Sequence, residues 1–115
     1  MTHEQIATVI AGIGLPYAYS HFEPGEVPDL PYICFIYPGR ADFHADGVNY
    51  AKITNLNIEL YTNEPDFDLE ARVEAALDAA GLVYDITDAT YIDSEQMYET
   101  LYQTSVLLDR SVAET

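Results

Sequence analysis

The sequence is short of basic residues. It has 4 Lys and Arg against 20 Asp and Glu, which gives a formal net charge of -16 at pH 7. A surface of this sign repels the phosphates of DNA, RNA and anionic membranes, so it argues against conventional nucleic-acid binding. It is compatible with a basic protein partner, cation binding, a high-salt habitat, or a surface along which nucleic acid moves without sticking. Of the acids, 14 lie from Glu59 onward, where Arg72 and Arg110 are the only bases.

Cysteine and long hydrophobic runs are also scarce. Cys34 is the single cysteine, so no disulfide within the chain and no thiolate metal cluster is expected. The longest apolar run, residues 33–37, is far too short to span a membrane. Glu4 stands where a signal peptide would carry its basic region, so we expect no signal peptide and synthesis in a reducing, intracellular compartment. With 115 residues, 49% of them hydrophobic, we expect one domain over residues 1–115.

The stretch 57–84 predicts a strand, a turn, a helix and the start of another strand. Leu56, Ile58 and Leu60 alternate with polar residues, as in a strand with one buried face. Apolar residues then recur at helical spacing, up to a glycine at position 81 where a helix would end: Leu69, Val73, Ala76, Leu77 and Ala80. The reverse face carries three acids at four-residue spacing, here called the acidic ridge: Glu70, Glu74 and Asp78. Like charges at this spacing cost roughly a few tenths of a kcal/mol per pair, so we interpret the ridge as serving something other than folding.

The flanking segments complete an α+β domain. Thr2 and Gln5 fit a capping box, and an apolar stripe predicts a first helix that ends at Gly14. Strands are predicted at 17–22, 32–37, 50–61, 83–92 and 97–108, with an extended loop at 23–31, a long polar loop or loose hairpin tip at 38–49 and a frayed tail at 109–115. The predicted order is α-β-β-β-α-β-β, a mostly antiparallel sheet with two helices on one face. The last strand is long enough to run past its partner and offer an edge.

No constellation of residues indicates an enzyme. Ser20 and His21 are neighbours on a predicted strand, so their side chains should point to opposite faces and form no dyad. Cys34 lies in an apolar strand and is interpreted as a buried packing thiol. Three side chains of one loop alternate as metal ligands do, but a solvated polar loop is the preferred interpretation: Asp42, His44 and Asp46. No catalytic, cofactor-binding or metal-binding residue is therefore predicted.

The chain contains 10 tyrosines, and two of them lie on one face of the last predicted strand. Tyr98 and Tyr102 share this face with Thr100 and Thr104 by the parity of their positions. One interpretation is cross-strand packing on a partly exposed sheet. The other is a subunit interface, because interfaces are rich in tyrosine and poor in lysine.

Three runs of the sequence together resemble a known family: LPYICFIYPGRADFHADGVNYAKI, then ITNLNIELYTNEPDFDLEARVEAALDAAGLVYD, then TYIDSEQMYETLYQTSV. They are similar to the tail-terminator or tail-completion proteins of long-tailed bacteriophages, which are also called head-tail joining or minor capsid proteins. The similarity extends over residues 4–106 and includes the opening helix that leads into GLPYAYSHFEPGEVPDLP. It implies an α+β virion structural protein without catalytic activity. Such proteins form a ring, usually of six copies, which sits on the head-proximal end of the tail tube, stops its polymerisation and provides the surface on which the head docks.

The resemblance also implies partners and contact residues. The partners would be further copies of the chain, the major tail tube protein and a head-completion protein, at the head-tail junction of a virion assembled in the host cytoplasm. DNA would pass through the ring without specific binding, and no membrane would be involved. The long loop would make contacts, which gives a candidate set with the strand tyrosines: Arg40, Asp42, Phe43, His44, Tyr98 and Tyr102. The acidic ridge of Glu70, Glu74 and Asp78 would line the bore or one face of the ring.

The chain departs from this family's pattern in its second helix, where many relatives carry several lysines and this chain has only Arg72. Three alternatives remain open on the sequence. One is a head-completion or stopper protein of the same junction. The second is a soluble acidic inhibitor that mimics nucleic acid and occupies a basic cleft. The third is a metal-dependent binding domain.

Overall fold

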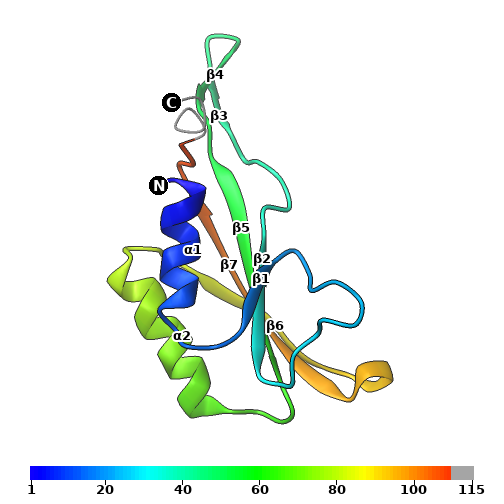
Figure 1. The fold of residues 1–115 in the computed structure, drawn as a ribbon. Coiled ribbons are helices and arrows are strands. Elements are labelled where there is room, and N and C mark those ends of the chain that lie inside the picture. The colour runs from blue at the N-terminus through cyan, green and yellow to red at the C-terminus, as the bar shows by residue number, and fades with distance from the viewer. Residues whose placement is uncertain (110–115) are drawn as a thin grey trace.

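A five-stranded sheet with two helices on one face forms the body of the protein (Figure 1). The structure is a computed structural model, and it describes residues 1–109. The strands of the sheet are β1 (Tyr17–Tyr19), β2 (Tyr32–Ile36), β5 (Thr54–Thr62), β6 (Asp85–Ile92) and β7 (Met97–Val106). Their order is β1-β2-β5-β7-β6, and only the β1/β2 pair is parallel. The predicted α+β class is therefore confirmed.

Both helices begin where side chains satisfy free backbone N–H groups. In front of α1 (His3–Ala11), the Thr2 hydroxyl accepts from the Gln5 backbone N–H, and the Gln5 side chain accepts from the Thr2 N–H, so the predicted capping box is present. In front of α2 (Phe67–Ala79), the Asp66 carboxylate accepts from the Leu69 N–H at 3.0 Å. Gly81 follows α2 with a φ of 74°, a left-handed conformation that favours glycine at the end of a helix.

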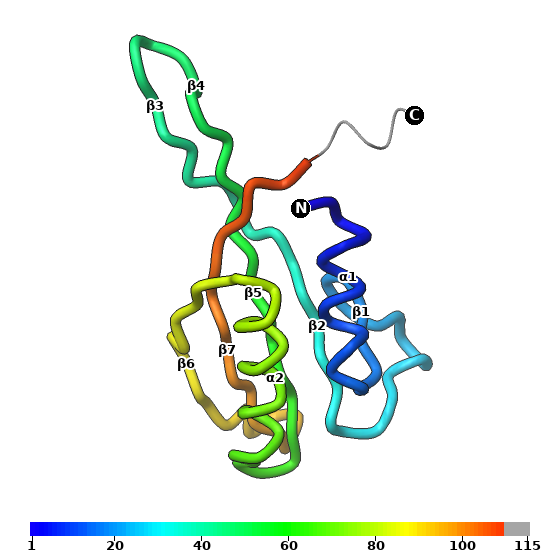
Figure 2. The backbone as a smooth tube through the Cα atoms, turned by 90° about the vertical axis from the view of Figure 1, so that its left-hand side faces the viewer, coloured from blue at the N-terminus to red at the C-terminus, as the bar shows by residue number. Residues whose placement is uncertain are grey.

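The core lies between the helices and the sheet. Leu56, Ile58 and Leu60 of β5 have no exposed surface, and they meet the α2 stripe predicted from the sequence: Leu69, Val73 and Leu77. Fully burying one such side chain contributes about 1.5–3 kcal/mol, so this shared stripe fixes α2 on the sheet. Figure 2 shows α1 over β1 and β2, and α2 over β5 and β7. Strand β6 lies beyond α2, and almost all of its side chains are exposed.

Several predicted boundaries differ from the structure, and three of the differences change the pattern of strands. The first strand ends at Tyr19 instead of residue 22, because Ser20 has a φ of 70° and leaves the extended conformation. The single strand predicted at 50–61 is divided into β4 (Val48–Ala51) and β5. The loop predicted at 38–49 contains β3 (Phe43–Ala45), which pairs with β4 as a separate two-stranded hairpin. Of the predicted tail, residues 110–115 lie outside the described residues.

The free edges of the sheet also differ from the prediction. Strand β7 does run past β6, whose pairing ends at Gln103, but β7 lies between β5 and β6. The long free edge therefore belongs to β6. A register shift between Ile86 and Asp88 and the acids along β6 are typical devices that discourage uncontrolled strand pairing at such an edge.

Candidate protein-protein interface

The most prominent feature outside the core is the segment 38–53, here called the arm. It contains β3 and β4, and it projects from one end of the sheet away from both helices (Figures 1 and 2). At its tip, Asp46 and Gly47 have φ angles of 52° and 75°. Two successive left-handed residues are typical of a tight hairpin turn whose twist matches that of its strands. The arm is therefore a built hairpin instead of a loose polar loop.

A network around Asp42 holds the base of the arm. The Asp42 carboxylate accepts from the Arg40 guanidinium, from Asn49 Nδ2 at 2.6 Å and from the Ile53 backbone N–H at 3.0 Å. Its side chain is only 6% exposed, and these donors, above all Arg40, hold the pKa of this carboxyl well below its usual range. Arg40 and Asp42 were predicted as partner contacts, but their charges are satisfied inside the arm. We therefore assign them to shaping the arm.

Beyond this network, the arm presents apolar side chains to solvent. Phe43 and Val48 are each 58% exposed, and Tyr50 is 76% exposed. The rings of Phe43 and Tyr50 contact each other edge to face, with centroids 6.3 Å apart. His44 is exposed beside them. Clustered exposed apolar and aromatic side chains mark interaction sites, so two of the predicted contact residues, Phe43 and His44, are available to a partner.

The tyrosine face of β7 is mostly core, which corrects one predicted contact. Tyr102 has no exposed surface, and its hydroxyl donates to Glu74 Oε2 at 3.2 Å. Burial and the nearby Glu74 carboxylate raise the pKa of Tyr102. Tyr102 therefore cannot contact a partner in this conformation, and it belongs to the core beneath α2 instead of to a partly exposed sheet. Tyr98 is half-buried against the ring of Tyr91 on the edge strand, with centroids 5.1 Å apart.

The three acids of the acidic ridge on α2 differ in their contacts with the core and in their exposure. Glu74 accepts the Tyr102 hydrogen bond, so the interpretation that no ridge acid serves folding is wrong for Glu74. Asp78 is exposed and Glu70 is half-buried; burial and then the Glu74 charge raise the pKa of Glu70. The opposite flank of α2 faces α1, where the Arg72 guanidinium donates to the Ile13 carbonyl. The ridge thus lies on the side of α2 that is turned toward β7 and β6.

A second acid pair lies on the other face of the sheet, and the sequence reasoning missed it. Glu59 of β5 and Glu99 of β7 are both half-buried, and the Tyr61 hydroxyl donates to Glu99 Oε2 at 3.0 Å. Burial and the charge of Glu99 raise the pKa of Glu59. Only the β5/β7 register, which pairs Tyr61 with Glu99, reveals this arrangement. On the same face, Cys34 is 4% exposed, and burial raises its pKa to about 11, which confirms the predicted packing thiol.

Ser20 and His21 form a contact that the sequence argument excluded. Ser20 Oγ lies 3.0 Å from His21 Nδ1, because the left-handed φ of Ser20 ends the alternation of a strand. His21 Nε2 lies 3.6 Å from Glu23 Oε1, but these two side chains are 67% and 71% exposed. Water competes for both groups at such exposure, so this contact orders a surface turn. Within residues 1–109, no three His, Cys, Asp or Glu side chains gather as metal ligands would.

No protein-family model matches the chain, and a search of curated proteins finds no similar sequence. No helix in the described part of the chain is long and apolar enough to cross a membrane.

Proposed function

We propose that this protein is a tail terminator of a long-tailed bacteriophage. Copies of it, six by the resemblance of the sequence, form a ring on the head-proximal end of the tail tube, stop tube polymerisation and present a docking surface to the head. The observation that carries the proposal is the arm, a projecting hairpin on which three exposed apolar side chains, Phe43, Val48 and Tyr50, lie within a few residues of one another. A monomer gains nothing from holding these side chains in water, whereas an assembly buries them.

A ring needs contacts in which one surface of a subunit meets a different surface of the next subunit. An arm on one end of an elongated molecule, with extents of 48 × 30 × 28 Å, suits such a head-to-tail contact. The Asp42 network supports this use, because it fixes the direction of the arm before a partner binds. Preorganisation of this kind lowers the entropic cost of association.

The charge distribution fits a ring that surrounds DNA. The arm carries two of the four basic residues and two acids, so the whole net charge of -16 lies outside it. We propose that Glu70 and Asp78, the ridge acids other than the Glu74 acceptor of Tyr102, face the bore or one rim of the ring. An acidic bore repels phosphates and lets DNA pass without binding. A ring structure with these acids on its outer surface and a neutral bore would contradict this part of the proposal.

The test is tube polymerisation with purified major tail tube protein. Tubes are grown with and without this protein, and their lengths and ends are examined by negative-stain electron microscopy. We expect shorter tubes with an additional density at one end. Tubes of unchanged length with bare ends would overturn the proposal. The Phe43→Ser/Tyr50→Ser variant should lose the effect, whereas the matched control Val83→Ser, at an 89% exposed apolar position outside the arm, should keep it.

The same experiment separates the alternatives. A head-completion or stopper protein would bind DNA-filled heads and leave tube length unchanged. An acidic inhibitor that mimics nucleic acid would bind a DNA-processing enzyme as a monomer or dimer and would also leave the tubes unchanged.

A further inference from the structure

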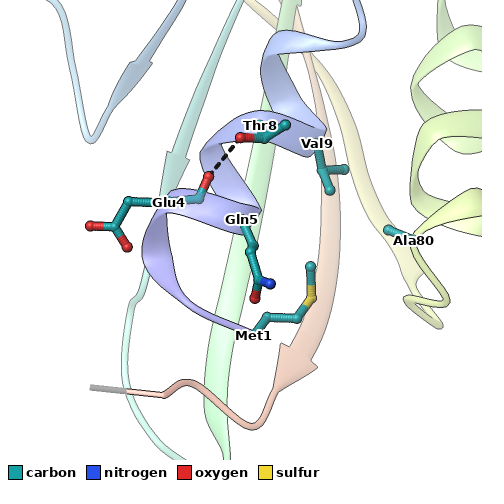
Figure 3. Close-up of a pocket in the computed structure, with 6 residues that line it drawn as sticks. All are labelled: Met1, Glu4, Gln5, Thr8, Val9 and Ala80. Carbon is teal, nitrogen blue, oxygen red and sulfur yellow. Dashed lines mark hydrogen bonds between the residues drawn. The ribbon is translucent and has the colours of Figure 1, made fainter. Parts of the chain in front are cut away.

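An apolar hollow lies at one end of the helix pair (Figure 3). It has a volume of about 390 Å³ and is lined by five side chains of the N-terminal segment and one at the end of α2: Met1, Glu4, Gln5, Thr8, Val9 and Ala80. The volume lies within the usual range for small-molecule pockets, about 300–1,000 Å³, and so suffices for one or two side chains.

The hydroxyl of Thr8 and the side-chain oxygen of Gln5 already have hydrogen-bond partners, which leaves most of the lining of the hollow apolar. The Thr8 hydroxyl donates to the Glu4 carbonyl at 2.9 Å, and Gln5 Oε1 accepts from the Thr2 N–H at 2.8 Å. Met1, Val9 and Ala80 then offer apolar surface without a polar group that needs a ligand. The Met1 ammonium group donates to the Leu107 carbonyl at 2.9 Å, and the exposed Glu4 carboxylate supplies the negative charge at the site. The hollow is thus suited to an apolar side chain accompanied by a positive charge.

The arm has these properties. Phe43 and Tyr50 are exposed aromatic side chains, and Lys52 at the end of the arm is exposed with no ion-pair partner among the described residues. The arm has no net charge, and the rest of the chain carries the full charge of -16. The acidic body of one copy therefore repels the arm of another copy less than it repels the other copy's body. The arm points away from the helices of its own chain, which leaves it accessible to another molecule (Figures 1 and 2).

We propose that the arm of one copy docks in the hollow of the next copy, with Tyr50 and Phe43 against Val9 and Ala80, and with Lys52 beside Glu4. The inference rests on the proposed ring and names its subunit contact. Each copy offers one arm and one hollow at different places, so the contact can continue from copy to copy and close into a ring that leaves neither element free. A reciprocal dimer, in which two copies exchange arms, would use the same contact, and the size of the trapped species distinguishes it from the ring.

The test is disulfide trapping in the full-length chain. A chain with Tyr50→Cys and Val9→Cys is oxidised and run on a non-reducing gel; Cys34 is buried and stays out of the reaction. We expect a ladder of disulfide-linked species larger than a dimer, which collapses to monomer on reduction. The control combines Tyr50→Cys with Ala75→Cys, an exposed position on α2 outside the hollow, and should give no species beyond a dimer.

Three results would overturn the docking. They are the absence of a ladder, an equally strong ladder in the Ala75→Cys control, and a monomer with an internal disulfide, which would mean that the arm folds onto its own hollow. Cross-linking to tail tube protein in place of a second copy would overturn it as well, because another partner would then fill the hollow.

A charge reversal tests the same contact without a disulfide. In the trapping chain, Lys52→Glu should lower the yield of the ladder about tenfold, and adding Glu4→Lys should restore it; circular dichroism verifies that each variant folds. A lack of rescue would exclude the Lys52–Glu4 contact. Wild-type protein that caps tubes while the cysteine pair gives no ladder would refute the docking alone. A ladder from a protein that leaves tube length unchanged would refute the proposed function alone.

Discussion

The hydrogen bond between Tyr102 and Glu74 gives a sharp test of what the acidic ridge does. Tyr102 has no exposed surface, and its hydroxyl donates to Glu74 Oε2 at 3.2 Å. Glu74→Ala leaves this hydroxyl without its acceptor, and an unsatisfied buried donor costs about 1–3 kcal/mol. Because Glu74 itself is half-buried, water replaces part of the loss, so we expect a decrease of about 1–2 kcal/mol in the free energy of unfolding. In a domain of this size, that corresponds to a decrease in Tm of about 4–10 °C.

Glu70→Ala is the matched control. Glu70 lies one turn earlier on α2, makes no side-chain hydrogen bond within the described residues, and is destabilised by burial and by the Glu74 charge. Alanine raises helix propensity equally at both positions, so that term cancels. Glu70→Ala relieves repulsion from Glu74 but removes an acid from the first turn of α2, where the helix dipole favours it. These effects oppose each other, so we expect Glu70→Ala to change the free energy of unfolding by less than about 0.5 kcal/mol. Urea unfolding followed by circular dichroism measures both variants, and equal effects at the two positions would refute the reasoning.

Three further outcomes are expected. Asp42→Ala should release the arm while the core keeps its stability, so amide exchange at residues 43–51 should rise at least tenfold and tube capping should fall with little change in Tm. Glu59→Gln should stabilise the fold by about 0.5 kcal/mol at pH 7.5, since the Glu59 pKa is raised in the folded state. Burial destabilises the ionised form of Glu59, so the stability gained by Glu59→Gln should disappear as the pH falls through the folded pKa of Glu59 toward about 4.3. Urea unfolding of both proteins at pH 7.5 and 4.5 measures this difference. Added NaCl should increase self-assembly, measured by light scattering, because salt screens the repulsion between the acidic bodies of two copies. A decrease in scattering with added NaCl would contradict the idea that this repulsion limits assembly.

The elements that the sequence predicts well are those with one buried face. The alternation around Ile58 and the helical spacing of Leu69, Val73 and Leu77 are local consequences of packing against a single core, so each can be recognised without knowing what lies opposite. The Thr2–Gln5 capping box is local in the same sense. The position of α2 on the sheet follows from these patterns, and the structure confirms it.

The features that sequence reasoning placed wrongly depend on contacts between distant residues. Tyr102 and Glu74 are 28 positions apart, and only the order β5-β7-β6 places the Tyr102 face of β7 beneath α2. Ser20 has a left-handed φ, but no glycine stands at this position to indicate such a conformation in the sequence. The arm is different, because Asp46-Gly47 between two short runs is a known hairpin signal that would have predicted β3 and β4.

The charge pattern and the arm have a joint explanation. Bodies that each carry a charge of -16 repel one another, and at about 0.15 M salt this repulsion extends over about 8 Å. An arm without net charge that projects beyond the body can cross this distance and make contact before the acidic surfaces meet. Between two free copies, repulsion opposes the weak apolar contact of a single arm. In a closed ring all arms are docked at the same time, so their combined attraction offsets the repulsion. Contacts between free copies would then be weak and short-lived, so that oxidation can still trap them as disulfides, and they would become stable when a template such as the proposed tail tube gathers the copies.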